Sequence, residues 1–352
     1  MIIYVLDGLN GISGIIDVYQ SVIWNVQFFG ESDFELKLIA DNKNINTLVK
    51  GAYLVRDFDI TPDGFQNVMI IENREIEYNI EEGWILTLTG GGLKKILKRR
   101  VVWNQTNLTG SVENGIRQVI TENAIEPADA TRQIPDLILD DPAGFTDTFD
   151  IQLLGENIAE WLTSVCTAYG IGWDVYIKNN KYVFNLKKGA DRTYEQDTNV
   201  PVVFSPEFDN LISATYSDNY EEFRNAALIG GEGEGIEQRT ATVGTAAGLD
   251  RYEDYIDGGS VSSNGEIITL ETYIKMLEDY GNEELKNAGL TEKFEGQILP
   301  DGVYKLDEDY FLGDLIQIDN GLVSAKSRIT EIIYAEDDNG FTYLPTFGVW
   351  ED

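Results

Sequence analysis

Apolar and polar residues alternate over most of residues 20 to 90, as they do in antiparallel strands that have one buried face. The alternating apolar residues are Trp24, Val26, Phe28, Phe34, Leu36, Leu38, Ile76, Tyr78, Ile80, Trp84, Leu86 and Leu88. Turn-forming residues at positions 30–33 and 81–83 separate successive runs. The pattern therefore predicts an all-β domain at residues 1–100, folded as a small barrel or sandwich.

Helical spacing appears in the next segment, residues 101–199. Ser111 has the side chain of a helix N-cap, and Gly170 is placed to end a second helix. The apolar residues at helical spacing are Val112, Ile116, Val119 and Ile120, then Leu154, Ile158, Trp161, Leu162, Val165 and Tyr169. A linker with three prolines at 126–150 separates the helices, and Asn179 and Asn180 mark the turn of a following hairpin. These features predict an α/β domain.

The rest of the chain returns to strand patterns around one insertion. Residues 200–232 and 291–352 predict a second β-domain in two pieces. Residues 233–290, between them, begin with a Gly-, Ser- and Thr-rich stretch and continue with a helix from Glu271 that brings Tyr273, Met276, Leu277 and Tyr280 together. The predicted fold class is α+β, mostly β. It consists of two β-barrel or sandwich domains, an intervening α/β domain and an inserted smaller domain.

Acidic residues dominate the charge of this 352-residue chain, because 61 Asp and Glu against 26 Lys and Arg give a formal net charge of −35. Such a surface repels phosphate, which argues against tight nucleic-acid binding. The chain has no histidine and a single cysteine, Cys166, so histidine-dependent catalysis, histidine-bearing zinc sites and internal disulfides are excluded. No apolar run approaches the ~20 residues of a membrane span, and the N-terminus lacks a signal-peptide pattern. We therefore expect no membrane anchor and synthesis in a cytoplasm.

One short segment departs from this acidity. Five basic residues lie within seven positions, interleaved with Leu93, Ile96 and Leu97: Lys94, Lys95, Lys98, Arg99 and Arg100. They fit a short amphipathic helix with a solvated basic face, and they fit equally a contact with an acidic surface on a neighbouring copy. The preceding glycines at 90–92 do not make a phosphate-binding P-loop, because Leu93 stands where the motif needs Gly-Lys followed by Ser or Thr.

Other candidate sites have simpler explanations. The glycine-rich residues 230–235 carry Glu232 and Glu234 where a phosphate would lie, so they predict a closely packed or flexible loop. Adjacent acidic pairs are expected by chance among 61 carboxylates, and no calcium-loop spacing occurs. Four tryptophans, at 24, 84, 161 and 173, lie on apolar stripes and are predicted to be core. The sequence thus predicts no catalytic, cofactor-binding or metal-binding residues.

A series of motifs resembles a family of siphophage tail proteins, the baseplate hub or tail-associated proteins of long-tailed phages and prophages. The main motifs are residues 189–193 (Gly-Ala-Asp-Arg-Thr), 203–211 (Val-Phe-Ser-Pro-Glu-Phe-Asp-Asn-Leu), 225–235 (Asn-Ala-Ala-Leu-Ile-Gly-Gly-Glu-Gly-Glu-Gly) and 248–253 (Gly-Leu-Asp-Arg-Tyr-Glu). Weaker similarity at Trp24, Arg100, residues 170–173, 310–316 and 346–348 extends it over nearly the whole chain.

The resemblance implies a structural virion component at the tail tip or baseplate. Family hubs carry two tail-tube-like barrels per chain, and three chains form a ring that acts as a symmetry adaptor between the sixfold tube and threefold tip components. The implied partners are further copies in a homotrimer, the distal tail protein, the tail tube, the tape measure and tip or fibre proteins. DNA is expected only as transient cargo at ejection, which the acidic charge permits. The family supplies no catalytic residues, so we expect a protein that is not an enzyme.

Two other functions stay open at this stage. One is a carboxylate-dependent glycoside hydrolase that acts on cell wall, and the other is a receptor-binding or carbohydrate-binding tail module. Neither accounts for the ordered motifs between residues 189 and 259.

Overall fold

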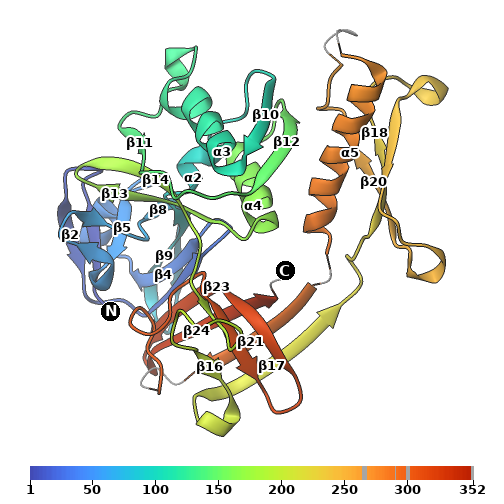
Figure 1. Ribbon diagram of the computed structural model, residues 1–352. Helices are drawn as coiled ribbons and strands as arrows, with labels where there is room; N and C mark the ends of the chain where they lie inside the picture. Colours follow the sequence, from blue (N-terminus) through green and yellow to red (C-terminus); the bar gives the residue numbers. More distant parts are fainter. Residues whose placement is uncertain (264–267, 290, 299–301, 350–352) are drawn as a thin grey trace.

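The computed structural model describes residues 1–263, 268–289, 291–298 and 302–349. Strands predominate, and most of them belong to one large, mainly antiparallel sheet (Figure 1). Its strands are β1 (Ile3–Leu6), β2 (Ile12–Ile16), β3 (Ser21–Gln27), β4 (Asp33–Ile39), β5 (Tyr53–Arg56), β8 (Met69–Asn79), β9 (Gly83–Gly92), β15 (Asp191–Arg192), β16 (Val203–Phe204), β17 (Leu211–Asn219), β21 (Thr291–Ile298), β22 (Leu315–Asp319), β23 (Ser324–Asp337) and β24 (Gly340–Val349).

This sheet joins the two β-regions of the sequence into a continuous structure. β23 pairs with β3 in antiparallel register, with Tyr334 opposite Trp24, so strands more than 300 residues apart in the sequence are neighbours. The order along the sheet is β17-β21-β24-β23-β3-β4-β9-β8-β5-β1-β2. Two separate barrel or sandwich domains were expected, but the strands of both regions pair in one sheet, and the pairings of the described strands close no barrel. The fold is therefore mostly β with an open sheet.

The core under this sheet comes from both β-regions. Trp24 and Leu36 of the first region pack in the same cluster as Phe204, Ile332 and Phe347 of the second. Since each region supplies apolar residues to the other, burial of this core stabilises the β23–β3 junction.

The α/β region has the local structure that its sequence predicts. α3 (Val112–Ile120) begins at Ser111, whose Oγ accepts a hydrogen bond from the Asn114 N–H at 3.4 Å. α4 (Ile158–Ala168) ends before Gly170, which has a φ of +60°. The hairpin of β13 (Gly172–Lys178) and β14 (Lys181–Lys187) turns at two asparagines with positive φ, as a type I′ turn requires.

The remaining strands of this region form two small sheets. β10 (Thr106–Ser111) pairs with β12 (Thr148–Leu153), and the β13–β14 hairpin lies between β11 (Leu137–Leu139) and β7 (Gly64–Phe65), which pairs with β6 (Ile60–Thr61). The expected linker at 126–150 thus contains β11, the start of β12 and a 3-10 turn, Ala130–Arg132. The α/β core also includes Leu6 and Val55, so it is continuous with the first β-region.

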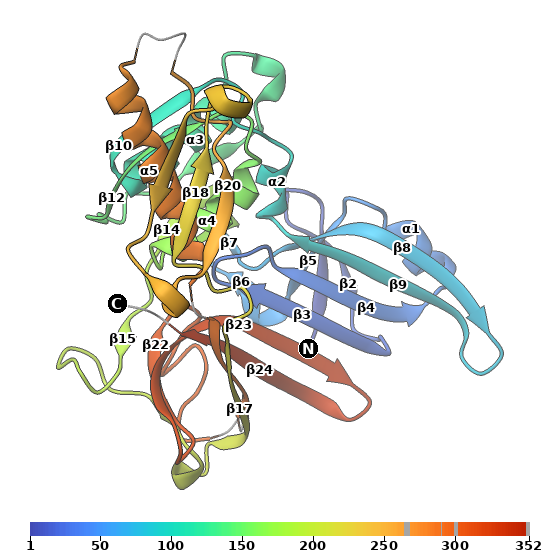
Figure 2. The ribbon, with the colours of Figure 1, turned by 90° about the vertical axis from the view of Figure 1, so that its right-hand side faces the viewer.

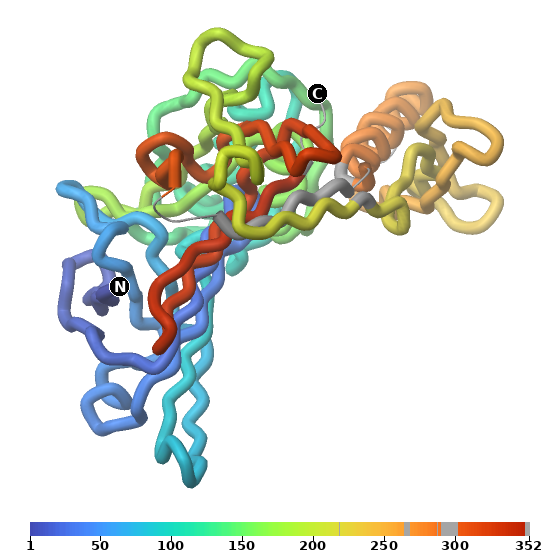
Figure 3. The backbone as a smooth tube through the Cα atoms, turned by 90° about the horizontal axis from the view of Figure 1, so that it is seen from below, coloured from blue at the N-terminus to red at the C-terminus, as the bar shows by residue number. Residues whose placement is uncertain are grey.

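A separate small unit, which we call the arm, consists of β18 (Ala226–Gly230), β19 (Thr240–Val243), β20 (Glu253–Asp257) and α5 (Leu270–Asn287). It has its own core, in which Ile229 and Val243 pack against Tyr273 and Leu277. The arm stands to one side of the body, and α5 is the element that faces the α/β region (Figures 1 and 3). β18 lies within residues expected in the second β-domain, but it pairs with β19 and β20 of the arm.

Two further short helices complete the fold, α1 (Asn42–Thr47) and α2 (Lys95–Lys98). Within the described ranges, no helix is both long and apolar enough to cross a membrane.

Candidate functional site: the basic helix and the free sheet edges

The basic segment begins at the end of β9 and forms the single turn α2. Its apolar residues Leu93, Ile96 and Leu97 are buried in the core of the α/β region, which anchors the turn. Gly90, one of the three glycines before the basic segment, lies inside the sheet, opposite Ile71 of β8. A Cβ at this position would lie 1.9 Å from the carbonyl oxygen of Ile70, so the close approach of β8 requires glycine there.

Lys94 is buried, with only 3% of its surface exposed. Its Nζ donates hydrogen bonds to the carbonyl oxygens of Gln27 at 2.7 Å and Gly30 at 2.9 Å, and it lies 5.0 Å from the ring centroid of Trp173. Burial lowers the pKa of Lys94 to about 8, although Asp174 opposes this shift. The side chain therefore ties the β3–β4 connection to the α/β region.

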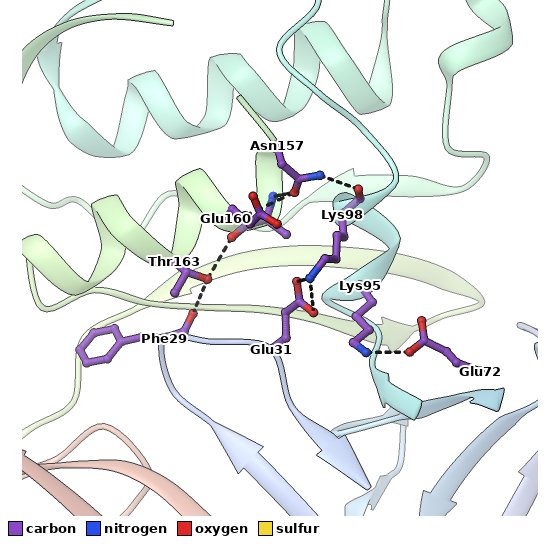
Figure 4. A network of polar contacts seen from close by, with 9 residues as sticks. Phe29, Glu31, Glu72, Lys95, Lys98, Asn157, Glu160 and Thr163 are labelled. Atoms are coloured by element: carbon purple, nitrogen blue, oxygen red, sulfur yellow. Dashed lines mark hydrogen bonds and ion pairs between the residues drawn. The ribbon is translucent and has the colours of Figure 1, made fainter. Parts of the chain in front are cut away.

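Lys95 and Lys98 form ion pairs within the chain, as Figure 4 shows. Lys95 Nζ lies 2.6 Å from Glu72 Oε2, and Lys98 Nζ lies 3.1 Å from Glu31 Oε1. Asn157, the N-cap of α4, donates from Nδ2 to the Lys98 carbonyl at 2.7 Å. The three lysines thus connect α2 to the first β-region and to α4, a structural use that the sequence pattern did not predict.

Arg99 and Arg100 lie on the outer side of this turn. Arg99 is exposed, and its guanidinium has no hydrogen-bond or ion-pair partner among the described residues. Arg100 Nε donates to the Arg132 carbonyl at 2.5 Å. Of the five basic residues, these two therefore remain the best placed to contact another molecule.

Two strand edges of the large sheet are also free. Among the described strands, β17 pairs with β21 alone, and residues 212–215 of β17 are exposed. Farther along the sheet, β5 pairs with β8 only at Met69 and Ile70, so β8 beyond Glu72 pairs with β9 alone among the described strands. The β8–β9 hairpin extends well beyond the body of the molecule (Figure 2). Each edge presents backbone N–H and C=O groups to a neighbour.

Comparison with known proteins identifies the chain. A family model described as Siphovirus ReqiPepy6 Gp37-like protein matches residues 2–349. The chain belongs to this family of siphovirus tail proteins. The resemblance in the sequence motifs is thereby confirmed. A comparison with curated proteins gave no match.

Solved structures agree with this tail-protein fold. A tail protein from Neisseria meningitidis MC58 is 12% identical to this chain, with a TM-score of 0.57, and the match covers 99% of this chain and 96% of the Neisseria chain. The 43 kDa tail protein of prophage MuSo2 from Shewanella oneidensis is 13% identical, with coverages of 99% and 98% and a TM-score of 0.55. Prophage tail protein gp18 from Listeria monocytogenes EGD-e is 10% identical, with coverages of 99% and 94% and a TM-score of 0.52.

The other candidate residues of the tail protein have structural roles. Acidic pairs cap turns, because Glu82 accepts from Asn79 and Asp337 accepts from the Asn339 N–H. The glycine-rich loop packs on α5, where a Cβ at Gly231 would lie 2.4 Å from the Tyr273 hydroxyl. In the part of the chain that the structure describes, no group of three or more acidic or cysteine side chains is arranged to hold a metal ion.

The prediction for the tryptophans is correct for three of the four. Trp24, Trp161 and Trp173 are buried, but Trp84 is 57% exposed and contacts the tilted ring of Tyr78 near the tip of the β8–β9 hairpin. It was predicted to be core because it alternates with buried Leu86, yet the hairpin carries it past the edge of the core. Trp103 is 62% exposed, and Trp350 lies outside the described residues.

Proposed function

We propose that this tail protein is the hub subunit of the tail tip, and that it forms a ring of three copies by pairing sheet edges. The observation that carries the proposal is a pair of strand edges in one sheet: among the described strands, β17 at one end of the sheet pairs with β21 alone, and β8 beyond Glu72 pairs with β9 alone. Two different edges of one chain can pair head to tail, and a head-to-tail interface that closes gives a ring. The number three follows the resemblance to baseplate hubs.

The chemistry of β17 supports edge pairing. Residues 211–217 contain no charged side chain, although 25% of the chain is charged. Exposed edge strands are usually protected by charged residues or proline, because an unprotected edge pairs readily with another strand. The absence of such protection at β17 favours addition of a strand from a neighbouring subunit.

A ring of this kind accounts for the other expected properties. It would join the tail tube and distal tail protein to tip or fibre proteins, with the tape measure as a further neighbour. Its strongly acidic subunits would not retain DNA, so DNA would pass as transient cargo at ejection. The function requires no catalytic residue, and we propose no enzymatic activity.

The experiment is a mass measurement by light scattering on the purified chain, with backbone variants of β17. We expect a mass near three chains of 39.5 kDa. Ala214 and Thr215 are adjacent in β17, so one of them directs its N–H away from β21. Proline at that residue should leave the fold intact but prevent assembly, whereas Thr215→Val keeps the N–H and should assemble normally. A monomeric wild-type protein, or assembly of both proline variants, would contradict the proposal.

A further inference from the structure

An arginine cluster with an exposed tryptophan lies next to the basic turn. We call Arg99, Arg100, Arg132 and Trp103 the Arg–Trp patch. The Arg132 guanidinium lies 4.8 Å from the ring centroid of Trp103, and the Arg100 guanidinium donates to the backbone carbonyls of Arg132 and Arg99 at 2.5 and 2.9 Å. Backbone contacts thus hold the Arg100 and Arg132 guanidinium groups, and the charge of Arg99 lies near enough to Arg100 to lower its pKa.

The patch lacks the carboxylate partners that several basic residues of the chain have. Lysines in the same α/β region, Lys181 and Lys188, form ion pairs with Asp136 and Asp147. Within the described ranges, none of the three patch arginines forms an ion pair. Burial together with the neighbouring positive charges of Arg132 and Arg99 lowers the pKa of Arg100. Clustering like charges without an acid is electrostatically unfavourable in the isolated chain.

The residue types of the patch are those that dominate protein interfaces. Tryptophan and arginine are the residues most enriched at energetic hot spots, and an arginine fork binds a carboxylate through two parallel hydrogen bonds. Trp103 remains 62% exposed even though Arg132 stacks on it. Burial of this large exposed ring against a partner surface would stabilise a complex through the hydrophobic effect.

We infer that the Arg–Trp patch is a docking site for a carboxylate-rich surface on a second copy of this chain. The choice of occupant rests on charge, because every copy carries a net charge of −35 and therefore offers abundant carboxylates. Nucleic acid is the weaker alternative, since the acidic chain around the patch repels phosphate along the rest of any duplex. The inference rests on the proposed ring, to which it adds a second contact between copies that does not involve the sheet edges.

The test compares charge reversal inside and outside the patch. Arg99→Glu is the main variant, because the Arg99 side chain has no partner whose loss would disturb folding. Trp103→Ala removes the exposed ring, and Lys50→Glu, at an exposed lysine on another surface, is the matched charge control. Self-association is measured by sedimentation over a range of concentrations at low and high salt, and thermal melting verifies the fold of each variant.

We expect Arg99→Glu and Trp103→Ala each to weaken self-association by about tenfold or more, with melting unchanged and Lys50→Glu behaving as wild type. High salt should weaken wild-type association more than that of Arg99→Glu. If the patch variants assemble as well as the control while the β17 proline variant does not, the patch inference is overturned and the ring stands. A monomeric wild type overturns both. Duplex DNA binding by wild type that Arg99→Glu abolishes would assign the patch to phosphate instead.

Discussion

The burial of Lys94 predicts an unusual dependence of stability on pH. An ammonium group in this environment has lost its hydration, and burial lowers its pKa to about 8 from the ordinary value of 10.5. In the unfolded chain the group has its ordinary pKa. Between pH 8 and 10 the unfolded state therefore binds more protons at this residue than the folded state does.

The sign follows from linkage. Where the unfolded state binds more protons, the free energy of unfolding rises with pH. For a pKa of about 8 in the folded state and 10.5 in the unfolded state, this contribution rises by about 2 kcal/mol from pH 8 to pH 10. Burial raises the pKa of the core tyrosines Tyr310 and Tyr334, so these groups lower the unfolding free energy as pH approaches their ordinary pKa of 10.0.

The assay is urea unfolding of wild type and Lys94→Met, followed by tryptophan fluorescence at pH 8, 9 and 10 at one protein concentration. The difference in unfolding free energy between the two proteins should grow by about 2 kcal/mol in favour of wild type over this range. The difference cancels groups that both proteins share, and Lys50→Met controls for removal of an exposed ammonium. A difference that is constant or shrinks with pH would refute the assignment of a buried, readily deprotonated lysine.

Two other substitutions test the packing of the sheet. Arg56 is fully buried, its Nε lies 2.5 Å from Asp59 Oδ2, and burial raises the pKa of Asp59. Arg56→Met should lower the free energy of chemical unfolding by about 3–5 kcal/mol, because it leaves the buried Asp59 carboxyl without its ion-pair partner. Adding Asp59→Leu to this variant should restore much of the lost free energy. Gly90→Ala places a Cβ against the Ile70 carbonyl; it should lower the melting temperature by several degrees, corresponding to about 1–3 kcal/mol, and an unchanged melting temperature would show that β8 and β9 separate easily.

Local structure was predictable wherever a side chain acts on its own backbone. Ser111 caps α3, Gly170 follows α4 with positive φ, and the asparagine pair turns the β13–β14 hairpin. Each signal depends on conformational preferences within a few residues, so it survives without knowledge of the tertiary fold.

What the sequence did not predict depends on contacts between distant segments. Alternation shows which residues share a face of a strand, but it does not show how much of the strand's length the hydrophobic core covers. Leu86 is buried, whereas Trp84, two residues away on the same strand, lies beyond the core. Likewise, spacing placed Lys94 with the basic residues, yet the β3–β4 connection covers it. The pairing of β23 with β3 has no local signature at all, because it joins residues more than 300 positions apart.

The net charge offers a way to find contact surfaces on this protein. Copies that each carry −35 repel one another, so an interface can form only where a surface lacks acid or offers positive charge. Two surfaces described above meet this condition, the uncharged edge of β17 and the Arg–Trp patch. They do so by different means, since strand pairing relies on backbone hydrogen bonds that salt hardly affects, whereas arginine–carboxylate contacts weaken as salt screens them. Salt titration of the assembly can therefore separate the two contacts. Assembly that persists in high salt but fails in the β17 proline variant depends on the sheet edge. The fraction of assembly that high salt abolishes depends on the Arg–Trp patch.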